Sequence, residues 1–240
     1  MVTMIEGGFT MKILFYDAKQ YDIESFNKQL KDYPEITVDY IETDINERTA
    51  SLADGYDAIC AFVSSDLGKN TIKTLGEKGV SLILMRCAGY NNVDLCAADR
   101  HDAVVCNVPA YSTNAVAQHT FALILNYFSK IREYSQKVDE GGWVNYKLFS
   151  YFGIPTYELA GKTIGIVGYG DIGKKVAEIA RAFGMKVITF TRSPQKITDG
   201  TPAVSLEELL KSSDVVTLHC PLTKDNEKMI NAESLGMMKK

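Results

Sequence analysis

The stretch IGIVGYGDIGKK, residues 164–175, decides how the second half of the chain folds. Its first four residues form an apolar run, and its glycines follow the spacing G-x-G-x-x-G. The apolar run predicts a buried strand, and the residues from 171 onward predict a helix that covers it. With a further strand over 186–191 the segment would form one βαβ unit. This is the context in which the glycine spacing is specific for a dinucleotide.

Each glycine of the motif has a separate physical reason. Gly168 permits a tight turn, Gly170 lets the backbone approach a pyrophosphate, and Gly173 lets the helix pack closely on the strand. A helix that begins near Asp171 would direct free N–H groups at the phosphates. The alternative is a glycine turn that only packs a helix on a strand. The complete βαβ pattern favours the dinucleotide site over that alternative.

The choice of cofactor depends on the end of the second strand. Proteins that bind NAD usually carry Asp or Glu about 20 residues after the motif, where the carboxylate accepts hydrogen bonds from the ribose. This strand ends instead in Thr191, Arg192 and Ser193, and we expect the next carboxylate, Asp199, to be merely solvated. One guanidinium and two hydroxyls suit a 2′-phosphate. We therefore predict NADP in preference to NAD, which stays the alternative.

The rest of the chain alternates between short apolar strands and amphipathic helical segments. Such alternation predicts an α/β fold with mostly parallel sheets, because each parallel crossover needs a covering helix. In the first half we expect strands at 12–16, 36–41, 57–63, 81–86 and 103–108. In the second half we expect strands at 163–168, 186–191 and 214–219, with helices at 171–183, 205–212 and 231–240.

A long helical pattern over 113–137 separates the two series, and a polar loop over 138–160 follows it. We expect this helix to be continuous and to join two α/β domains. Its apolar periodicity predicts one buried face, formed by Val116, Thr120, Leu123, Ile124 and Tyr127.

Composition narrows the class of protein further. The formal net charge of −4 argues against a nucleic-acid or anionic-membrane partner, and no apolar run reaches the ~18 residues of a membrane span. The five cysteines never follow a C-x-x-C spacing, so we expect reduced thiols, a cytoplasmic location and no metal site. Met11 precedes a clean strand, and we interpret residues 1–10 as a leader produced by a misassigned start.

Four ordered motifs around the glycine loop carry a family resemblance: RCAGYNNVD at 86–94, NVPAYS at 107–112, GKT at 161–163 and HCPLT at 219–223. With them the chain resembles the D-isomer-specific 2-hydroxyacid dehydrogenases, which include D-lactate, glycerate and phosphoglycerate dehydrogenases. The resemblance implies a flavodoxin-like substrate domain over 1–110 and a Rossmann-type nucleotide domain over 111–240. It also implies an active site between the domains and a homodimer formed through the long helix near 113–137.

The resemblance assigns roles by matching position. Ala88 and Gly89 would offer backbone N–H groups to a substrate carboxylate, and Tyr111 would lie near the substrate or pack in the hinge. In the nucleotide domain, Asp171 and Ile172 match the pair that contacts the pyrophosphate beside the motif glycines. Thr191 and Arg192 depart from the family, which usually has an aspartate there, and this departure is why Thr191, Arg192 and Ser193 are predicted to bind NADP. Cys220, acting through its backbone, Pro221 and Asn226 would lie along the nicotinamide side.

The catalytic Arg, Glu and His of the family lie beyond residue 240, so the resemblance implies a nucleotide domain that is incomplete at its C-terminus. We expect His101 to be a surface residue. We expect none of the three histidines, His101, His119 and His219, to replace the catalytic residues of the family, and we assign no catalytic residue. The implied function is an NAD(P)-dependent dehydrogenase of small 2-oxo acids, inactive as 240 residues. Tyr111 favours lactate-like acids, whereas Arg192 favours NADPH-linked reduction of glyoxylate or hydroxypyruvate. A non-catalytic dinucleotide-binding sensor or corepressor-like module is the alternative.

Overall fold

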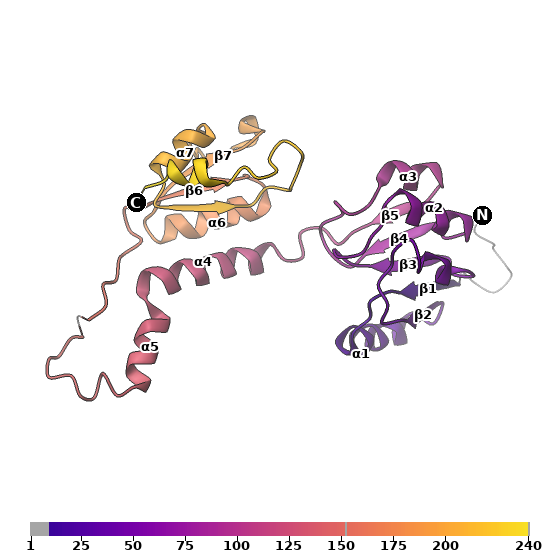
Figure 1. Ribbon diagram of the computed structural model, residues 1–240, viewed down its shortest axis with the longest axis horizontal. Helices are drawn as coiled ribbons and strands as arrows, with labels where there is room; N and C mark the ends of the chain where they lie inside the picture. Colours follow the sequence, from indigo (N-terminus) through magenta and orange to yellow (C-terminus); the bar gives the residue numbers. More distant parts are fainter. Residues whose placement is uncertain (1–9, 152, 240) are drawn as a thin grey trace. The chain divides into compact units, whose positions relative to one another are not determined.

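A computed structural model describes residues 10–151 and 153–239 of the chain (Figure 1). The chain divides into two compact units, the first ending at Tyr111 and the second beginning at Ser112. Each unit has its own sheet and its own hydrophobic core. The interpretation of residues 1–10 as a leader falls almost entirely on residues outside the described part of the chain.

The described part of the first unit contains a five-stranded parallel sheet in the order β2-β1-β3-β4-β5. This order is that of flavodoxin-like folds and confirms the predicted fold class. The strands are β1 Met11–Phe15, β2 Ile36–Tyr40, β3 Ala58–Ala61, β4 Leu82–Met85 and β5 Val104–Cys106. The helices are α1 Gln20–Gln29, α2 Lys69–Glu77 and α3 Leu95–Arg100, with short 3-10 turns at Leu30–Asp32 and Ala50–Ala53.

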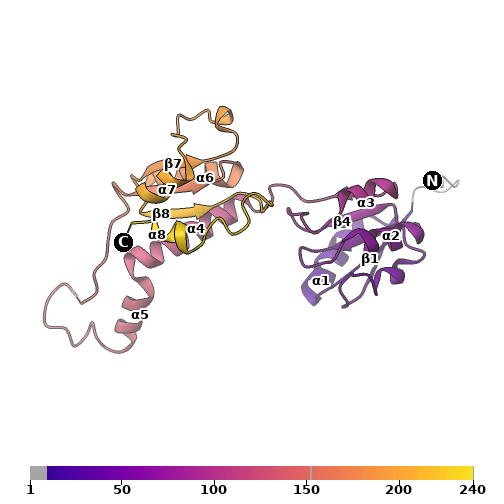
Figure 2. The same ribbon diagram turned by 45° about the horizontal axis from the view of Figure 1, so that its top comes forward.

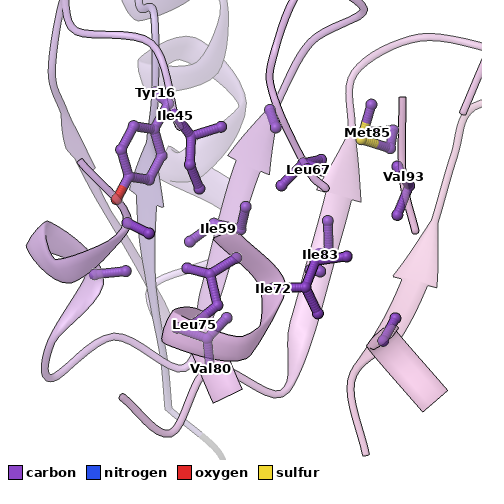
Figure 3. Close-up of a cluster of buried hydrophobic side chains, with 14 of the residues drawn as sticks. Tyr16, Ile45, Ile59, Leu67, Ile72, Leu75, Val80, Ile83, Met85 and Val93 are labelled. Atoms are coloured by element: carbon purple, nitrogen blue, oxygen red, sulfur yellow. The ribbon is translucent and has the colours of Figure 1, made fainter. Parts of the chain in front are cut away.

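Both faces of this sheet are buried, which follows from the two-residue period of a strand. In β1, Phe15 points to the cluster beneath α1, whereas Leu14 points to the larger cluster beneath α2 and α3. Figure 3 shows this larger cluster, in which Ile72 and Leu75 of α2 lie against Ile59 and Ile83 of the central strands. Apolar residues cover both faces, so the strands appear in the sequence as continuous apolar runs.

The second unit, as far as it is described, forms a parallel sheet in the order β7-β6-β8. Its strands are β6 Thr163–Val167, β7 Lys186–Phe190 and β8 Val215–Leu218. Its helices are α4 Thr113–Ser129, α5 Ile131–Asp139, α6 Asp171–Ala182, α7 Leu206–Ser212 and α8 Ala232–Gly236, with a 3-10 turn at Pro194–Lys196. The helices α6 and α7 cover opposite faces of the sheet (Figure 1).

The strand β6–helix α6–strand β7 unit confirms the βαβ prediction. Beyond β7, Ala203 forms an isolated parallel bridge with Thr189. This bridge occupies the place of a third strand, so the order along the sheet is 3-2-1-4, as in Rossmann folds.

The prediction of one continuous helix over 113–137 is wrong. Lys130 has φ +52°, in the left-handed region, and it divides the segment into α4 and α5 (Figure 1, Figure 2). A helix cannot pass through that backbone conformation, because its hydrogen bonds need right-handed torsions.

The prediction of the buried face of this helix is also wrong, because the buried stripe is displaced by about one residue from the predicted one. The buried stripe consists of Ala117, Phe121, Ile124 and Phe128. Leu123 and Tyr127 are 59% and 66% exposed. Apolar residues occur on more than one side of α4, and packing against small residues of α6 such as Ala177 selects the stripe that is buried.

The final helix is shorter than expected. α8 covers Ala232–Gly236, and the side chain of Asn231, which precedes it, accepts a hydrogen bond from the backbone N–H of Ser234. Over residues 10–151 and 153–239, no helix combines the length and apolarity that crossing a bilayer requires. The same residues bring together no His, Cys, Asp and Glu side chains suited to hold a metal ion.

Gly165, in the middle of β6, provides a test of the packing between β6 and α7. A Cβ at this position would lie 2.5 Å from Leu209 Cδ2 and would also collide with Ser213 Oγ. We expect Gly165→Ala to lower the free energy of unfolding by about 1–3 kcal/mol through overpacking. Urea unfolding followed by circular dichroism and by the fluorescence of Trp143, the single tryptophan, measures this loss.

Gly236→Ala is the matched control, because a Cβ there meets no described atom within 4 Å apart from its chain neighbours and the backbone of its own helix. We expect its unfolding free energy to stay within about 0.5 kcal/mol of the wild-type value. Equal stabilities of Gly165→Ala and Gly236→Ala would contradict the close packing of β6 on α7.

Candidate functional site

A cavity of about 460 Å³ lies at the carboxyl ends of β6, β7 and β8 in the second unit. Three loops line it: the glycine loop after β6, the segment Phe190–Ser193 after β7, and the segment that follows β8 from His219. Ligands of open α/β sheets bind at this edge, in the crevice outside the carboxyl ends of the strands. The site therefore forms where three separate segments of sequence meet.

The glycine loop is shaped by close backbone approaches. Gly168 has φ +95°, and a Cβ there would lie 2.7 Å from the carbonyl oxygen of His219. A Cβ at Gly173 would collide with the carbonyl oxygen of Gly168. These two glycines therefore let the loop cross the end of β8 and let α6 pack against the loop.

Gly170 differs from its neighbours. A Cβ built there meets no described atom of the chain within 4 Å. Internal packing therefore does not require glycine at this position, and the open space beside it leaves room for a ligand. An open glycine at this place is what a loop that approaches a phosphate would have.

The amino end of α6 starts at this open glycine. Gly170 is the N-cap residue and has no side chain to cap the first turn. The first N–H groups of a helix have no intrahelical partner, so those of Asp171 and Ile172 are available to an anion at the loop. The residues present therefore fit a pyrophosphate.

The end of β7 supplies the side chains expected to select the cofactor. Thr191, Arg192 and Ser193 all line the cavity. The Ser193 backbone N–H donates to Thr191 Oγ1 at 3.2 Å, which fixes the turn. Arg192 is exposed and makes no ion pair or hydrogen bond with the described residues, so its donors remain available.

The expectation that Asp199 is merely solvated is wrong. Its carboxylate accepts hydrogen bonds from Tyr169 Oη at 2.7 Å and from Arg181 Nη2 at 3.0 Å. Partial desolvation acts to raise its pKa, but the hydrogen bonds from Tyr169, Thr201 and Arg181 hold the pKa of this carboxyl well below its usual range. Asp199 is therefore charged at neutral pH and engaged within the protein.

The loop after β8 is held by Asn226. Its Nδ2 donates to the carbonyl oxygen of Pro221 at 2.8 Å, and its Oδ1 accepts from the Thr223 N–H at 2.7 Å. Asn226 thus closes the loop internally, while Cys220 and Pro221 line the cavity beside it. His219 also lines the cavity, where Thr217 Oγ1 lies 2.8 Å from its Nε2 and burial lowers its pKa.

A second group of predicted residues lies in the first unit, in the turn after β4. Asn107 Nδ2 donates to the carbonyl oxygen of Ala88 at 2.8 Å, and Cys87 Sγ donates to that of Gly89 at 3.2 Å. Among the described residues, no group accepts a hydrogen bond from the N–H of Ala88 or Gly89. The turn therefore presents two free donors that suit a carboxylate. Tyr111, at the end of the same unit, is 63% exposed.

Sequence reasoning missed two residues that hold these loops. Arg86 is enclosed between the rings of Phe15 and Phe62 and donates to the carbonyl oxygen of Asp17 at 3.1 Å, tying the end of β1 to the turn that carries Ala88. Tyr169 stands inside the glycine motif and lines the cavity. Their positions in the motifs were visible, but their side-chain partners lie far away along the chain.

The other two histidines do not join the cavity. His101, expected at the surface, is half-buried, and a Cβ at Gly76 of α2 would lie 2.7 Å from its Cβ. His101 therefore has a packing role. His119 is exposed on α4.

Comparisons with known proteins agree with this geometry. The family model described as D-isomer specific 2-hydroxyacid dehydrogenase, NAD binding domain, matches residues 121–240. The 2-hydroxyacid dehydrogenase homolog 1 of Schizosaccharomyces pombe is 38% identical over 233 residues, which cover 96% of this chain and 68% of that protein. The chain spans about two thirds of the length of the curated relatives it matches.

Solved structures show the same relationship. D-lactate dehydrogenase from Aquifex aeolicus, complexed with NAD and lactic acid, is 31% identical with a TM-score of 0.80, and the match covers 95% of this chain and 66% of that one. An acyclic imino acid reductase in complex with NADPH and D-Arg is 28% identical with a TM-score of 0.81, over 95% and 71% of the two chains. The chain therefore belongs to the D-isomer-specific 2-hydroxyacid dehydrogenases, a family of oxidoreductases, and its second unit carries the family's NAD-binding domain.

Proposed function

We propose that the protein is, by its binding sites, a dehydrogenase of the kind that transfers a hydride between a nicotinamide dinucleotide and a small 2-oxo or 2-hydroxy acid of the lactate, glycerate or glyoxylate type, and that these 240 residues bind both molecules without turnover. The observation that carries this proposal is the combination of two preformed features. The second unit has a glycine-loop cavity with an open Gly170, and the first unit has a turn with free N–H groups at Ala88 and Gly89. A sensor of dinucleotides alone would not need the second feature.

The first unit would bind the acid through its carboxylate. Asn107 Nδ2 holds the carbonyl group of Ala88, and the Val108 N–H holds that of Cys87. These two carbonyl groups share peptide planes with the N–H groups of Gly89 and Ala88, so the direction of both donors is fixed before a substrate arrives. Fixed donors bind an anion with little loss of conformational freedom. The hydroxyl of the exposed Tyr111 would make a further contact with the substrate.

We further propose that the cofactor is NADP(H) rather than NAD(H), the hydride being supplied by the nicotinamide ring when the cofactor is bound. Similar structures contain NAD in one case and NADPH in another, so the side chains at the end of β7 decide. Arg192 offers a charged, bidentate donor beside the hydroxyls of Thr191 and Ser193. Asp199, the one acidic residue of this segment, is engaged with Arg181.

Arg192→Ala tests the assignment. Loss of charge-assisted hydrogen bonds of about 1.5–3 kcal/mol corresponds to an NADPH affinity about tenfold to a hundredfold lower. The affinity for NADH, which has no 2′-phosphate, should change less than about threefold. Titration of the purified chain with each reduced nucleotide, followed by nucleotide fluorescence, measures both dissociation constants.

Gly170→Ala is the control for the loop itself. Its Cβ would occupy the space proposed for the pyrophosphate, so both nucleotides should bind more weakly by similar factors. Tighter binding of NADH than of NADPH to the wild-type chain would contradict the NADP assignment. Failure of the wild-type chain to bind either nucleotide would contradict the proposed function.

Turnover needs a general acid with a pKa near neutrality, and the described histidines do not supply one in the cavity. Burial lowers the pKa of His219 below its ordinary value, so its ring is neutral at pH 7 and has no extra proton to donate. We expect the 240-residue chain to bind NADPH without oxidising it. An assay of reduced-nicotinamide absorbance with pyruvate, hydroxypyruvate and glyoxylate tests this, and measurable oxidation would contradict it.

We also propose that the protein is a cytoplasmic homodimer that acts on a small molecule and not on nucleic acid or membranes. Its net charge of −4 and its five free cysteines support these assignments. Apolar side chains left exposed on α4 and α5 support self-association: Leu123, Tyr127, Ile131 and Val138.

The dimer is tested by Leu123→Glu. A carboxylate on this apolar face should cost enough desolvation energy to shift the chain from dimer to monomer. Sedimentation velocity measures the change, and Leu52→Glu, a substitution at a similarly exposed leucine of the first unit, should leave the dimer intact. A monomeric wild-type chain would contradict the proposal.

A further inference from the structure

A polar network of four side chains connects three segments of the second unit. Tyr169 comes from the glycine loop, Arg181 from α6, and Asp199 and Thr201 from the segment after the 3-10 turn. Tyr169 Oη donates to Asp199 Oδ2 at 2.7 Å and lies 2.6 Å from Thr201 Oγ1. Arg181 Nη2 donates to Asp199 Oδ2 at 3.0 Å, to Tyr169 Oη at 3.3 Å and to Thr201 Oγ1.

This network positions one wall of the cavity. The segment that contains Arg192 and Ser193 is tied to β7 at one end, and beyond Asp199 the bridge between Thr189 and Ala203 returns it to the sheet. Asp199 itself caps the turn, since its Oδ1 accepts from both the backbone N–H and the hydroxyl of Thr201. The network therefore fixes the far end of the loop that begins at Arg192.

The network also neutralises a charge. Asp199 is ionised, and the guanidinium of Arg181 is the positive group in contact with it. Asp199 keeps 37% of its side chain exposed, and it also accepts a hydrogen bond from Tyr169, a residue that lines the cavity. Without Arg181, an uncompensated negative charge would remain on the loop that carries Arg192.

We propose that Arg181 is a positioning residue that determines cofactor specificity: by neutralising Asp199 it allows the cavity to accept a 2′-phosphate. This inference rests on the proposed function, namely that the cavity binds a nicotinamide dinucleotide. It assigns discrimination to a residue that does not itself line the cavity. A residue with a purely structural role would change the affinities for NADH and NADPH by the same factor, so the ratio of the two affinities is the informative quantity.

The experiment compares dissociation constants of NADPH and NADH for the purified chain and its variants. In Arg181→Met the affinity for NADPH, relative to that for NADH, should fall about threefold to tenfold, because the unpaired carboxylate repels the 2′-phosphate. Adding Asp199→Asn to Arg181→Met removes that charge and should restore the ratio. Arg181→Lys keeps the charge and should keep most of the ratio.

Two further variants complete the set. Arg100→Met removes an equal charge from the end of α3 in the first unit and should leave the ratio unchanged. Asp199→Asn alone removes the carboxylate that pairs with Arg181 and should raise the affinity for NADPH relative to that for NADH. This variant keeps the inference testable even if Arg181→Met unfolds. Circular dichroism reports the folding of each variant.

Equal losses of NADH and NADPH affinity in Arg181→Met would overturn the inference and leave Arg181 a structural residue. So would a double variant that does not recover the ratio. The change in ratio between variant and wild type tests Arg181 whichever cofactor the wild type prefers. Absence of binding of either nucleotide to the folded wild-type chain would overturn the proposed function and this inference with it.

Discussion

The glycine loop depends on one steric constraint: its backbone crosses the end of β8 with no room for a side chain. The carbonyl oxygen of His219 lies 2.7 Å from where a Cβ of Gly168 would stand, and the carbonyl oxygen of Gly168 in turn touches the place of a Cβ at Gly173. These contacts place the first turn of α6 over the carboxyl edge of the sheet. The open space at Gly170, the free N–H groups of α6 and the cavity itself all follow from that placement.

The second theme is the placement of charge around the cavity. Arg192 is available at the end of β7, whereas Asp199, only a few residues further on, is engaged with Arg181 and Tyr169. Two charges of opposite sign in one loop thus differ in availability, because one is paired with described residues and the other is not. Counting charges in the sequence of this loop would have missed the distinction, since it arises from a residue on α6.

The two units use the same architectural rule with different chemistry. In both, parallel strands end at an edge where loops present backbone N–H groups, and in both a side chain secures the loop: Asn107 in the first unit and Asn226 in the second. The first unit adds Arg86, enclosed by two aromatic rings, to join β1 and β4 near that edge. Each unit therefore prepares its half of the proposed reaction by itself.

The sequence by itself determined the fold class, the βαβ unit and the positions of the loops that line the cavity. Apolar runs and the three motif glycines report local requirements, such as burial on both faces of a strand or a backbone that tolerates no Cβ. The tertiary structure decided three other features: which stripe of α4 is buried, where Lys130 breaks the long helix, and which charge pairs with Asp199. These outcomes depend on α6, which supplies both the small residues beneath α4 and Arg181. The physical reason is that periodicity and motifs describe a segment alone, whereas packing and ion pairing are set by the partner that another segment brings.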